Sequence, residues 1–149
     1  MQITREVLLP VSADVLWSFL WDVPRVVACL PGCVDAAEVE PQRRYRARMQ
    51  QRVGPISIDV PLDVEILEAD PPRRLVLKAS GRDRLVGAEI AMRVTLACAP
   101  ATAGSMLRID ADGRVLGKLG ALGHGVIQRK AEEAVAEFAA RAARAVAPA

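Results

Sequence analysis

The feature that most constrains the fold is a pair of alternating segments on either side of Gly54-Pro55. Residues 44–53 and 56–67 both carry apolar side chains at nearly every second position, which is typical of strands with one buried face. Glycine at the first position of a two-residue turn tolerates a positive φ, and proline at the second has a compatible fixed φ. The sequence therefore predicts an antiparallel hairpin closed by a type II′ turn.

The turn also fixes which residues face each other, because a slip by one residue would exchange the two faces of each strand. One face of the hairpin is then almost wholly apolar, and opposite charges meet on the other face, which favours this register. The apolar face pairs Val53 with Ile56, Gln51 with Ile58, Met49 with Val60, Ala47 with Leu62 and Tyr45 with Val64. The polar face pairs Arg46 with Asp63, Arg44 with Glu65 and Arg48 with Pro61.

Further strands are predicted before and after this hairpin. Segments 3–9 and 34–39 precede it, with Ile3, Arg5, Val7 and Leu9 on one face of the first. The inward rows that follow it are Leu75, Leu77 and Ala79; then Ala88, Ile90, Met92, Val94 and Leu96; then Leu107, Ile109 and Ala111. Breaks at 70–72, 81–84 and 99–104 separate these rows, and neighbouring strands in sequence favour an antiparallel meander.

Helices are predicted at two places in the chain. Ser12 is a suitable N-cap for a helix with Val15, Leu16, Phe19 and Leu20 on its apolar face, and Asp14 suits its first turn. A second short helix is expected to begin with Asp22 as its cap and Pro24 in its first turn, and to end near Cys29. From about Val115 to Val146 the apolar spacing becomes helical, with Ile127, Ala131, Ala134, Val135, Phe138 and Ala142 on one face.

This terminal helix is expected to be about 45 Å long and to end before Pro148. Its first half carries five glycines, at 113, 117, 120, 123 and 125, and each internal glycine costs a helix roughly 1 kcal/mol relative to alanine. We therefore expect a single α+β domain over residues 1–149: a curved antiparallel sheet of about seven strands, two short helices after strand 1, and a long C-terminal helix. A helix so poor in side chains would cover the sheet without filling the space beneath it, which predicts a ligand cavity.

Several motifs resemble those of the CoxG family, which is named for a component of carbon monoxide dehydrogenase. They are residues 15–22, Cys29-Leu30-Pro31-Gly32-Cys33, Val53-Gly54-Pro55-Ile56, Asp70-Pro71-Pro72, Gly81, and Gly117-Lys118-Leu119-Gly120 with Gly123. The resemblance implies a START-like (SRPBCC) helix-grip fold, whose members bind lipids, quinones, hormones or polyketides. It also implies an accessory role beside molybdenum hydroxylases such as carbon monoxide dehydrogenase, including recruitment to the membrane. Longer members have an anchoring C-terminal extension, whereas this sequence stops at Ala149.

Composition excludes several other classes of protein. A formal net charge of +2 is too small to indicate nucleic-acid binding, and no apolar run is long enough for a membrane-spanning helix. The N-terminus has no secretory pattern, so we expect a cytoplasmic protein, with peripheral contact at the inner face of the membrane left open. Cys29, Cys33 and Cys98 are expected to be reduced thiols that pack in the core or in loops. With a single histidine, His124, the sequence predicts no metal site and no cofactor.

The ligand is expected to contact side chains that point between the sheet and the last helix. These are Trp17, Leu20, Leu30, Tyr45, Met49, Gln51, Val60, Leu62, Leu77, Met92, Leu107, Leu119, Leu122 and Val126. Trp17, Tyr45 and Met49 are equally compatible with ordinary core packing. Gln51 is the one polar residue on the apolar hairpin face, so its amide either bonds water or backbone or orients a ligand carbonyl.

The remaining polar residues have plain alternatives. His124 and Lys118 are expected at an exposed rim. The arginines at 44, 46, 48, 73, 74, 82 and 84 form either a solvated, ion-paired surface or a docking patch for an acidic partner or anionic headgroups.

No catalytic residue is predicted, because Arg5 and Gln51 are the only polar groups on the inward rows and arginine does not donate a proton near neutral pH. We therefore expect a non-catalytic binding protein for an apolar or amphipathic molecule such as a quinone or lipid. The alternatives are a polyketide cyclase-like or other enzyme of the same superfamily, and a pure protein–protein adaptor.

Overall fold

The computed structural model describes residues 1–83, 85 and 87–147. The elements are β1 (Gln2–Leu9), α1 (Ala13–Trp21), α2 (Val23–Ala28), β2 (Cys33–Glu40), β3 (Arg44–Val53), β4 (Ile56–Asp70), β5 (Arg74–Asp83), β6 (Ala88–Ala101), β7 (Gly104–Gly117), the 3₁₀ helix η1 (Gly120–Leu122) and α3 (His124–Val146). The order predicted from the sequence, one strand, two short helices, six strands and a long helix, is confirmed.

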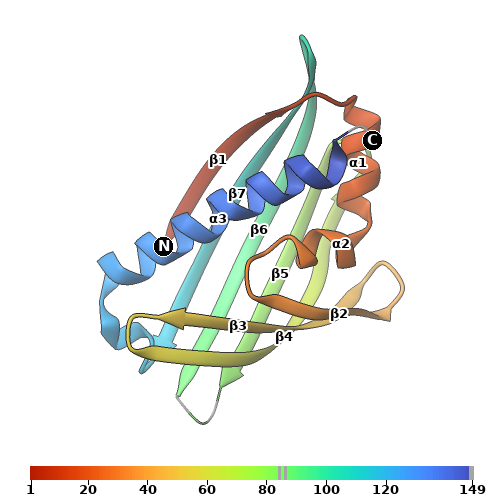
Figure 1. Ribbon diagram of the computed structural model, residues 1–149. Coiled ribbons are helices and arrows are strands. Elements are labelled where there is room, and N and C mark those ends of the chain that lie inside the picture. The colour runs from red at the N-terminus through yellow and green to blue at the C-terminus, as the bar shows by residue number, and fades with distance from the viewer. Residues whose placement is uncertain (84, 86, 148–149) are drawn as a thin grey trace.

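All seven strands form one antiparallel sheet in the order β1-β7-β6-β5-β4-β3-β2. Strands β2 to β7 are a meander, and β1 joins its far end by pairing with β7. The sheet is strongly curved, α3 runs across its inner face, and α1 and α2 lie together at one end of α3 (Figure 1). This arrangement is the helix-grip fold that the sequence predicted.

The hairpin register is confirmed at every predicted position. Val53 pairs with Ile56, Tyr45 pairs with Val64, and the pairs between them follow in step. Gly54 has a φ of +58°, the positive value that the turn requires of its first residue. Period-2 patterning with matched charges is thus sufficient to position these two strands.

Helices α1 and α2 follow the predicted capping only in part. The Ser12 hydroxyl accepts a hydrogen bond of 3.2 Å from the Val15 N–H, as expected for an N-cap. Val15 itself is exposed, so its predicted place on the buried face is wrong, whereas Leu16, Phe19 and Leu20 are buried. At the start of α2, the Asp22 side chain makes no capping hydrogen bond.

The predicted start of the terminal helix is wrong. Val115 and Gly117 belong to β7, where they pair with Ile90 and Ala88 of β6, because the cross-strand ladder continues to that point. Gly117 then turns the chain with a φ of +77°, and a Cβ there would lie 1.6 Å from the Gly87 carbonyl oxygen. Helix α3 begins only at His124, so its 23 residues span about 35 Å rather than 45 Å.

Two predicted breaks between strands are also too long. β5 continues through Gly81 and Arg82 to Asp83, and β6 continues to Ala101, leaving only residues 102–103 between β6 and β7. In both cases the hairpin ladder extends through residues whose composition favoured a loop. Arg84 and Pro148, which the sequence placed in a turn and after the last helix, lie outside the described residues.

Candidate functional site

The inner face of the sheet differs between its ends and its middle. At one end Leu75, Leu96 and Leu107 are fully buried, and at the other Val60 and Ala88 are as well. In the middle, facing the same side, Ala79, Met92, Val94 and Val115 stay partly accessible although they lie on the covered face of the sheet. Alternate positions of a strand share a face, so these residues border the space between the sheet and α3.

Small residues create this loosening of the inner face. Gly113 lies opposite Met92, and a Cβ at position 113 would lie 2.9 Å from Met92 Cγ, so the methionine side chain occupies the room that the glycine leaves. Ala79 lies opposite Met92 on the other side. On the opposing helix, Ala131 packs against the core and is only partly buried. Short side chains on both layers leave the middle less filled than the ends.

The predicted ligand-contacting residues divide into three groups by exposure. Leu20, Tyr45, Val60, Leu62, Leu77, Leu107 and Leu119 are buried members of the core. Trp17, Leu30, Met49, Met92 and Leu122 are partly buried and pack against that core, and Gln51 is partly buried at its margin. Val126 is exposed in the first turn of α3.

Three residues of the inner face, Ala79, Val94 and Val115, were absent from the predicted ligand contacts. The signal that identifies them is the alignment of small residues across neighbouring strands: Gly81 and Ala79 on β5, and Gly113 and Ala111 on β7. That alignment becomes readable only when the registers of all the strands are known.

Gln51 connects the hairpin to the loop after α2. Its Nε2 donates a hydrogen bond to the Pro31 carbonyl oxygen, and the Gln50 N–H donates to the Gly32 carbonyl oxygen at 2.8 Å. The backbone alternative for the Gln51 amide is therefore the one observed. Trp17 and Trp21 stack on α1, with ring centroids 5.6 Å apart, and both are partly buried.

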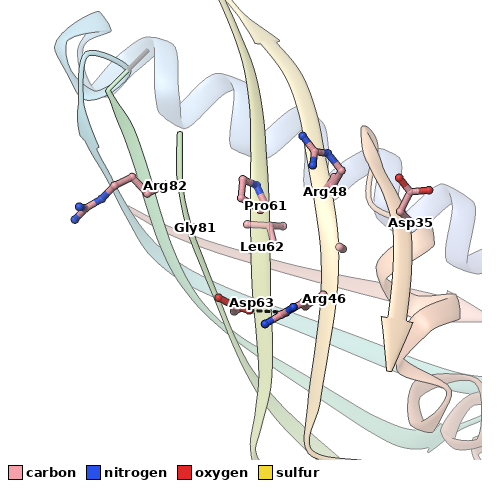
Figure 2. Close-up of a pocket in the computed structure, with 9 residues that line it drawn as sticks. Asp35, Arg46, Arg48, Pro61, Leu62, Asp63, Gly81 and Arg82 are labelled. Carbon is pink, nitrogen blue, oxygen red and sulfur yellow. Dashed lines mark ion pairs between the residues drawn. The ribbon is translucent and has the colours of Figure 1, made fainter. Parts of the chain in front are cut away.

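A surface groove of about 470 Å³ lies on the outer side of β3, β4 and β5 (Figure 2). It is lined by Asp35, Arg46, Ala47, Arg48, Pro61, Leu62, Asp63, Gly81 and Arg82. Only Leu62 is shared with the predicted ligand contacts. The arginines of this groove are already paired with acidic residues: Arg46 with Asp63 at 3.6 Å, Arg48 with Asp59 at 2.9 Å and Arg82 with Glu89 at 3.1 Å.

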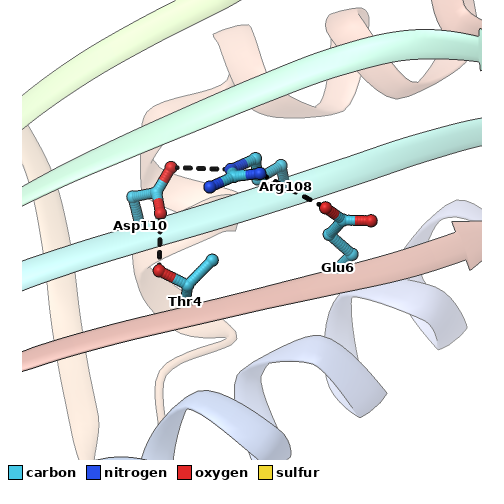
Figure 3. Close-up of polar contacts among 4 residues, drawn as sticks. All are labelled: Thr4, Glu6, Arg108 and Asp110. Carbon is cyan, nitrogen blue, oxygen red and sulfur yellow. Dashed lines mark hydrogen bonds and ion pairs between the residues drawn. The ribbon is translucent and has the colours of Figure 1, made fainter.

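Ion pairing extends over the rest of the outer face. Arg108 of β7 contacts Asp110 at 3.0 Å and Glu6 of β1 at 3.3 Å, and the Thr4 hydroxyl donates to Asp110 at 2.8 Å (Figure 3). The hydrogen bonds from Arg108 and Thr4 hold the pKa of Asp110 below its usual value. Arg44, Arg73 and Arg74 are also ion-paired, which matches the solvated-surface alternative for the arginines described by the structure.

All three cysteines are free and buried. Burial raises the pKa of the Cys33 thiol to about 11, and it also raises the pKa of Cys29 in spite of the nearby Arg25, Arg141 and Arg144. Burial, followed by the Asp14 carboxylate, raises the pKa of Cys98. These thiols stay protonated near neutral pH, so they behave as apolar packing groups rather than nucleophiles.

The other titratable groups on the inner face are spread over three strands. Burial, and then the neighbouring Glu38 carboxylate, raises the pKa of Tyr45 on β3. Asp83 at the end of β5 accepts hydrogen bonds from the Asp59 and Leu85 N–H groups at 3.2 and 3.0 Å. Arg5 of β1 and His124 of α3 are exposed. An acid and a base acting on one substrate must converge within hydrogen-bonding reach of it, and these groups belong to separate rows of the sheet.

Neither a metal centre nor a membrane-spanning helix is formed by the described residues. Among residues 1–83, 85 and 87–147, no group of three or more His, Cys, Asp or Glu side chains is placed to hold a metal ion. Within that same part of the chain, no helix combines the length and the apolar character needed to cross a bilayer.

A family model for CoxG, a component of carbon monoxide dehydrogenase, matches residues 6–147. The chain belongs to this family. The match includes β2 to β7, both short helices, α3 and the loop between α2 and β2, so the CoxG assignment concerns the whole fold and not a single motif. A comparison with the sequences of curated proteins found no match.

Solved structures share the fold of this CoxG chain. A conserved protein from Geobacillus kaustophilus is 17% identical with a TM-score of 0.85, and the alignment covers 98% of this chain and 95% of that one. A protein from Chromobacterium violaceum is 15% identical with a TM-score of 0.72, covering 100% and 99%. DynU16, a protein of the dynemicin biosynthetic locus, is 20% identical with a TM-score of 0.56, covering 96% of this chain but 46% of its own. At these identities the likeness shows the fold alone.

Proposed function

We propose that this chain is a non-catalytic accessory protein that holds an apolar or amphipathic molecule, quinone-like or lipid-like, between the inner face of the sheet and α3. We further propose that it serves a molybdenum hydroxylase such as carbon monoxide dehydrogenase. The CoxG family assignment supports the accessory role. The observation that carries the ligand proposal is the accessible middle of the inner face, at Ala79, Met92, Val94 and Val115, between two fully buried ends.

The chemistry of this region favours an apolar ligand. The accessible side chains are hydrocarbon or thioether, and methionine adapts to varied apolar shapes. Covering them removes apolar surface from water, which stabilises a complex by roughly 25 cal/mol per Å² of area buried. The Gln51 amide at the margin of this face already donates to Pro31, so any polar end of the ligand would meet few competing groups.

The ligand proposal is tested by native mass spectrometry and organic extraction of the purified chain, followed by titration with a panel of quinones and fatty acids. We expect a bound molecule, or uptake of at least one member of the panel. Ala79→Leu should fill the middle of the inner face and weaken binding by tenfold or more while the chain remains folded.

Ala91→Leu is the matched control, because Ala91 is a partly buried alanine on the opposite face of the adjacent strand β6. It should leave binding unchanged. A chain that binds nothing on the panel, or equal losses in the two variants, would refute the interior site. The accessory role is tested separately by pull-down with purified carbon monoxide dehydrogenase, and absence of any association would count against it.

A further inference from the structure

One end of the molecule gathers exposed apolar side chains from four segments. This end, called here the glycine end, comprises the β3–β4 turn at 54–55, the β5–β6 connection, the stretch from Leu116 through η1, and the first turn of α3 (lower left in Figure 1). Two contacts bring these segments together. The Lys118 N–H donates to the Gly87 carbonyl oxygen at 2.9 Å, and a Cβ at Gly54 would lie 3.9 Å from Leu122 Cδ1.

Three large apolar side chains of the glycine end face solvent. Leu85 is 94% exposed, Leu116 49% and Val126 44%. They project from the surface rather than line a groove, and positions 123 and 125 beside them carry no side chain and have nothing within 4 Å. Apolar side chains held in water in this way mark a surface that contacts an apolar medium or partner.

The cations at this end are not neutralised by the protein. Arg52, Lys118 and Arg129 are exposed and make no ion pair with the residues that the structure describes. This contrasts with the outer groove, whose three arginines each have a carboxylate partner. The glycine end therefore combines protruding apolar groups with uncompensated positive charge.

We propose that the glycine end docks on a bilayer surface that contains anionic lipids. Leu85, Leu116 and Val126 enter the boundary between headgroups and acyl chains, while Arg52, Lys118 and Arg129 contact the phosphates above it. Projecting apolar side chains beside cations match a layer that is apolar below and negatively charged above. Docking is distinct from ligand binding, because the docking surface is the same whether or not the interior is occupied.

The test is co-sedimentation of the full chain with vesicles of phosphatidylcholine mixed with phosphatidylglycerol, compared with vesicles of phosphatidylcholine alone. We expect binding to the mixed vesicles that weakens with added salt, and weaker binding to the neutral ones. The double variant Leu85→Ser with Leu116→Ser should lower the partition constant about tenfold, since two exposed leucines no longer transfer into the interface. Leu8→Ser, which changes a leucine 69% exposed on β1, is the matched control and should bind as the wild type does.

Charge is tested with Lys118→Glu and Arg129→Glu, each expected to weaken binding to the mixed vesicles about fivefold or more. Lys78→Glu changes an exposed lysine in the middle of β5 and should have a much smaller effect. Circular dichroism confirms that each variant is folded. Wild-type protein that ignores anionic vesicles, or controls that lose as much binding as the variants of the glycine end, would overturn the proposal. Neither result bears on the ligand titration, so the two proposals fail independently.

Discussion

The two faces of the sheet are built from the same strands but held by different forces. Inner-face side chains such as Leu107 lose all contact with water, whereas their outer-face neighbours, such as Arg108, form exposed ion pairs. Burial of apolar area stabilises a fold far more than exposed ion pairs, which contribute about 0 to 1 kcal/mol each. Stability should therefore depend on the inner face, and substitutions on the outer face should have small effects.

The largest expected effect comes from Leu107→Ala on β7. Leu107 is fully buried, so its truncation should lower the free energy of unfolding by about 3 kcal/mol, measured by urea denaturation. Leu8→Ala on the adjacent strand β1 changes an exposed leucine of the outer face and should have an effect of about 0.5 kcal/mol or less. Similar losses in both variants would break the comparison between the faces.

The next effect concerns backbone contact within the sheet. A Cβ at Gly81 would lie 2.4 Å from the Pro61 carbonyl oxygen and 2.5 Å from Val60 Cγ1, so Gly81→Ala forces β4 and β5 apart. We expect a loss of about 2 kcal/mol in denaturant unfolding. Gly125→Ala is the control, since nothing lies within 4 Å there and alanine should stabilise α3 by up to about 1 kcal/mol. An unchanged Gly81→Ala protein would mean that the strands move apart without cost.

A smaller effect separates the faces by pH in the alkaline range. Cys33 shares the inner side with Met49, and burial raises its pKa from 9.0 to about 11. Its contribution to stability is complete below pH 9, where both states keep the thiol protonated. Above pH 9 the unfolded chain ionises first, so this contribution falls as the pH rises towards 11. Urea midpoints between about pH 8 and pH 11 should decline less steeply for Cys33→Ala than for the wild type, and parallel curves would contradict this.

The smallest effect lies at acid pH on the outer face. The folded-state pKa of Asp110 is lowered, chiefly by the hydrogen bond from Arg108, so its contribution is present above its ordinary value of 3.8 and is lost as the pH falls through the lowered pKa. Asp110→Asn should remove this component from the acid limb of a stability–pH curve. Asp112→Asn, at an exposed carboxylate of the same strand, should not. Equal changes in both variants would point to overall charge and not to the Arg108 contact.

Local pattern was enough for the hairpin of β3 and β4 but not for the segment after β7. In the hairpin, turn residues, apolar alternation and opposite charges all agree, so the register follows from the sequence. At Val115 to Gly125, the glycines and leucines fit a helix and a strand end equally well. Only the pairing of Gly117 with Ala88 decides between them, and it depends on a partner far away in the chain.

The candidate site shows the same limit. The sequence predicted that inner-face residues such as Met49 and Met92 would lie beneath the last helix, and these are among the partly buried side chains there. The predicted cause, a glycine-rich half-helix, was wrong, because only Gly125 of that group lies within α3. The loosening of the middle comes from small residues aligned across β5 and β7, which depends on strand register rather than on local composition.

The pairing of β1 with β7 has a consequence for how the chain is made. The Met1 backbone is hydrogen-bonded to Gly113, 112 residues further on, and β1 has no other strand beside it in the sheet that the structure describes. During synthesis the first strand therefore waits without a partner until nearly the whole polypeptide has left the ribosome. Its apolar side chains, Ile3 and Leu9 among them, are open to premature contacts throughout that interval. The edge that is translated first is the last to be sealed.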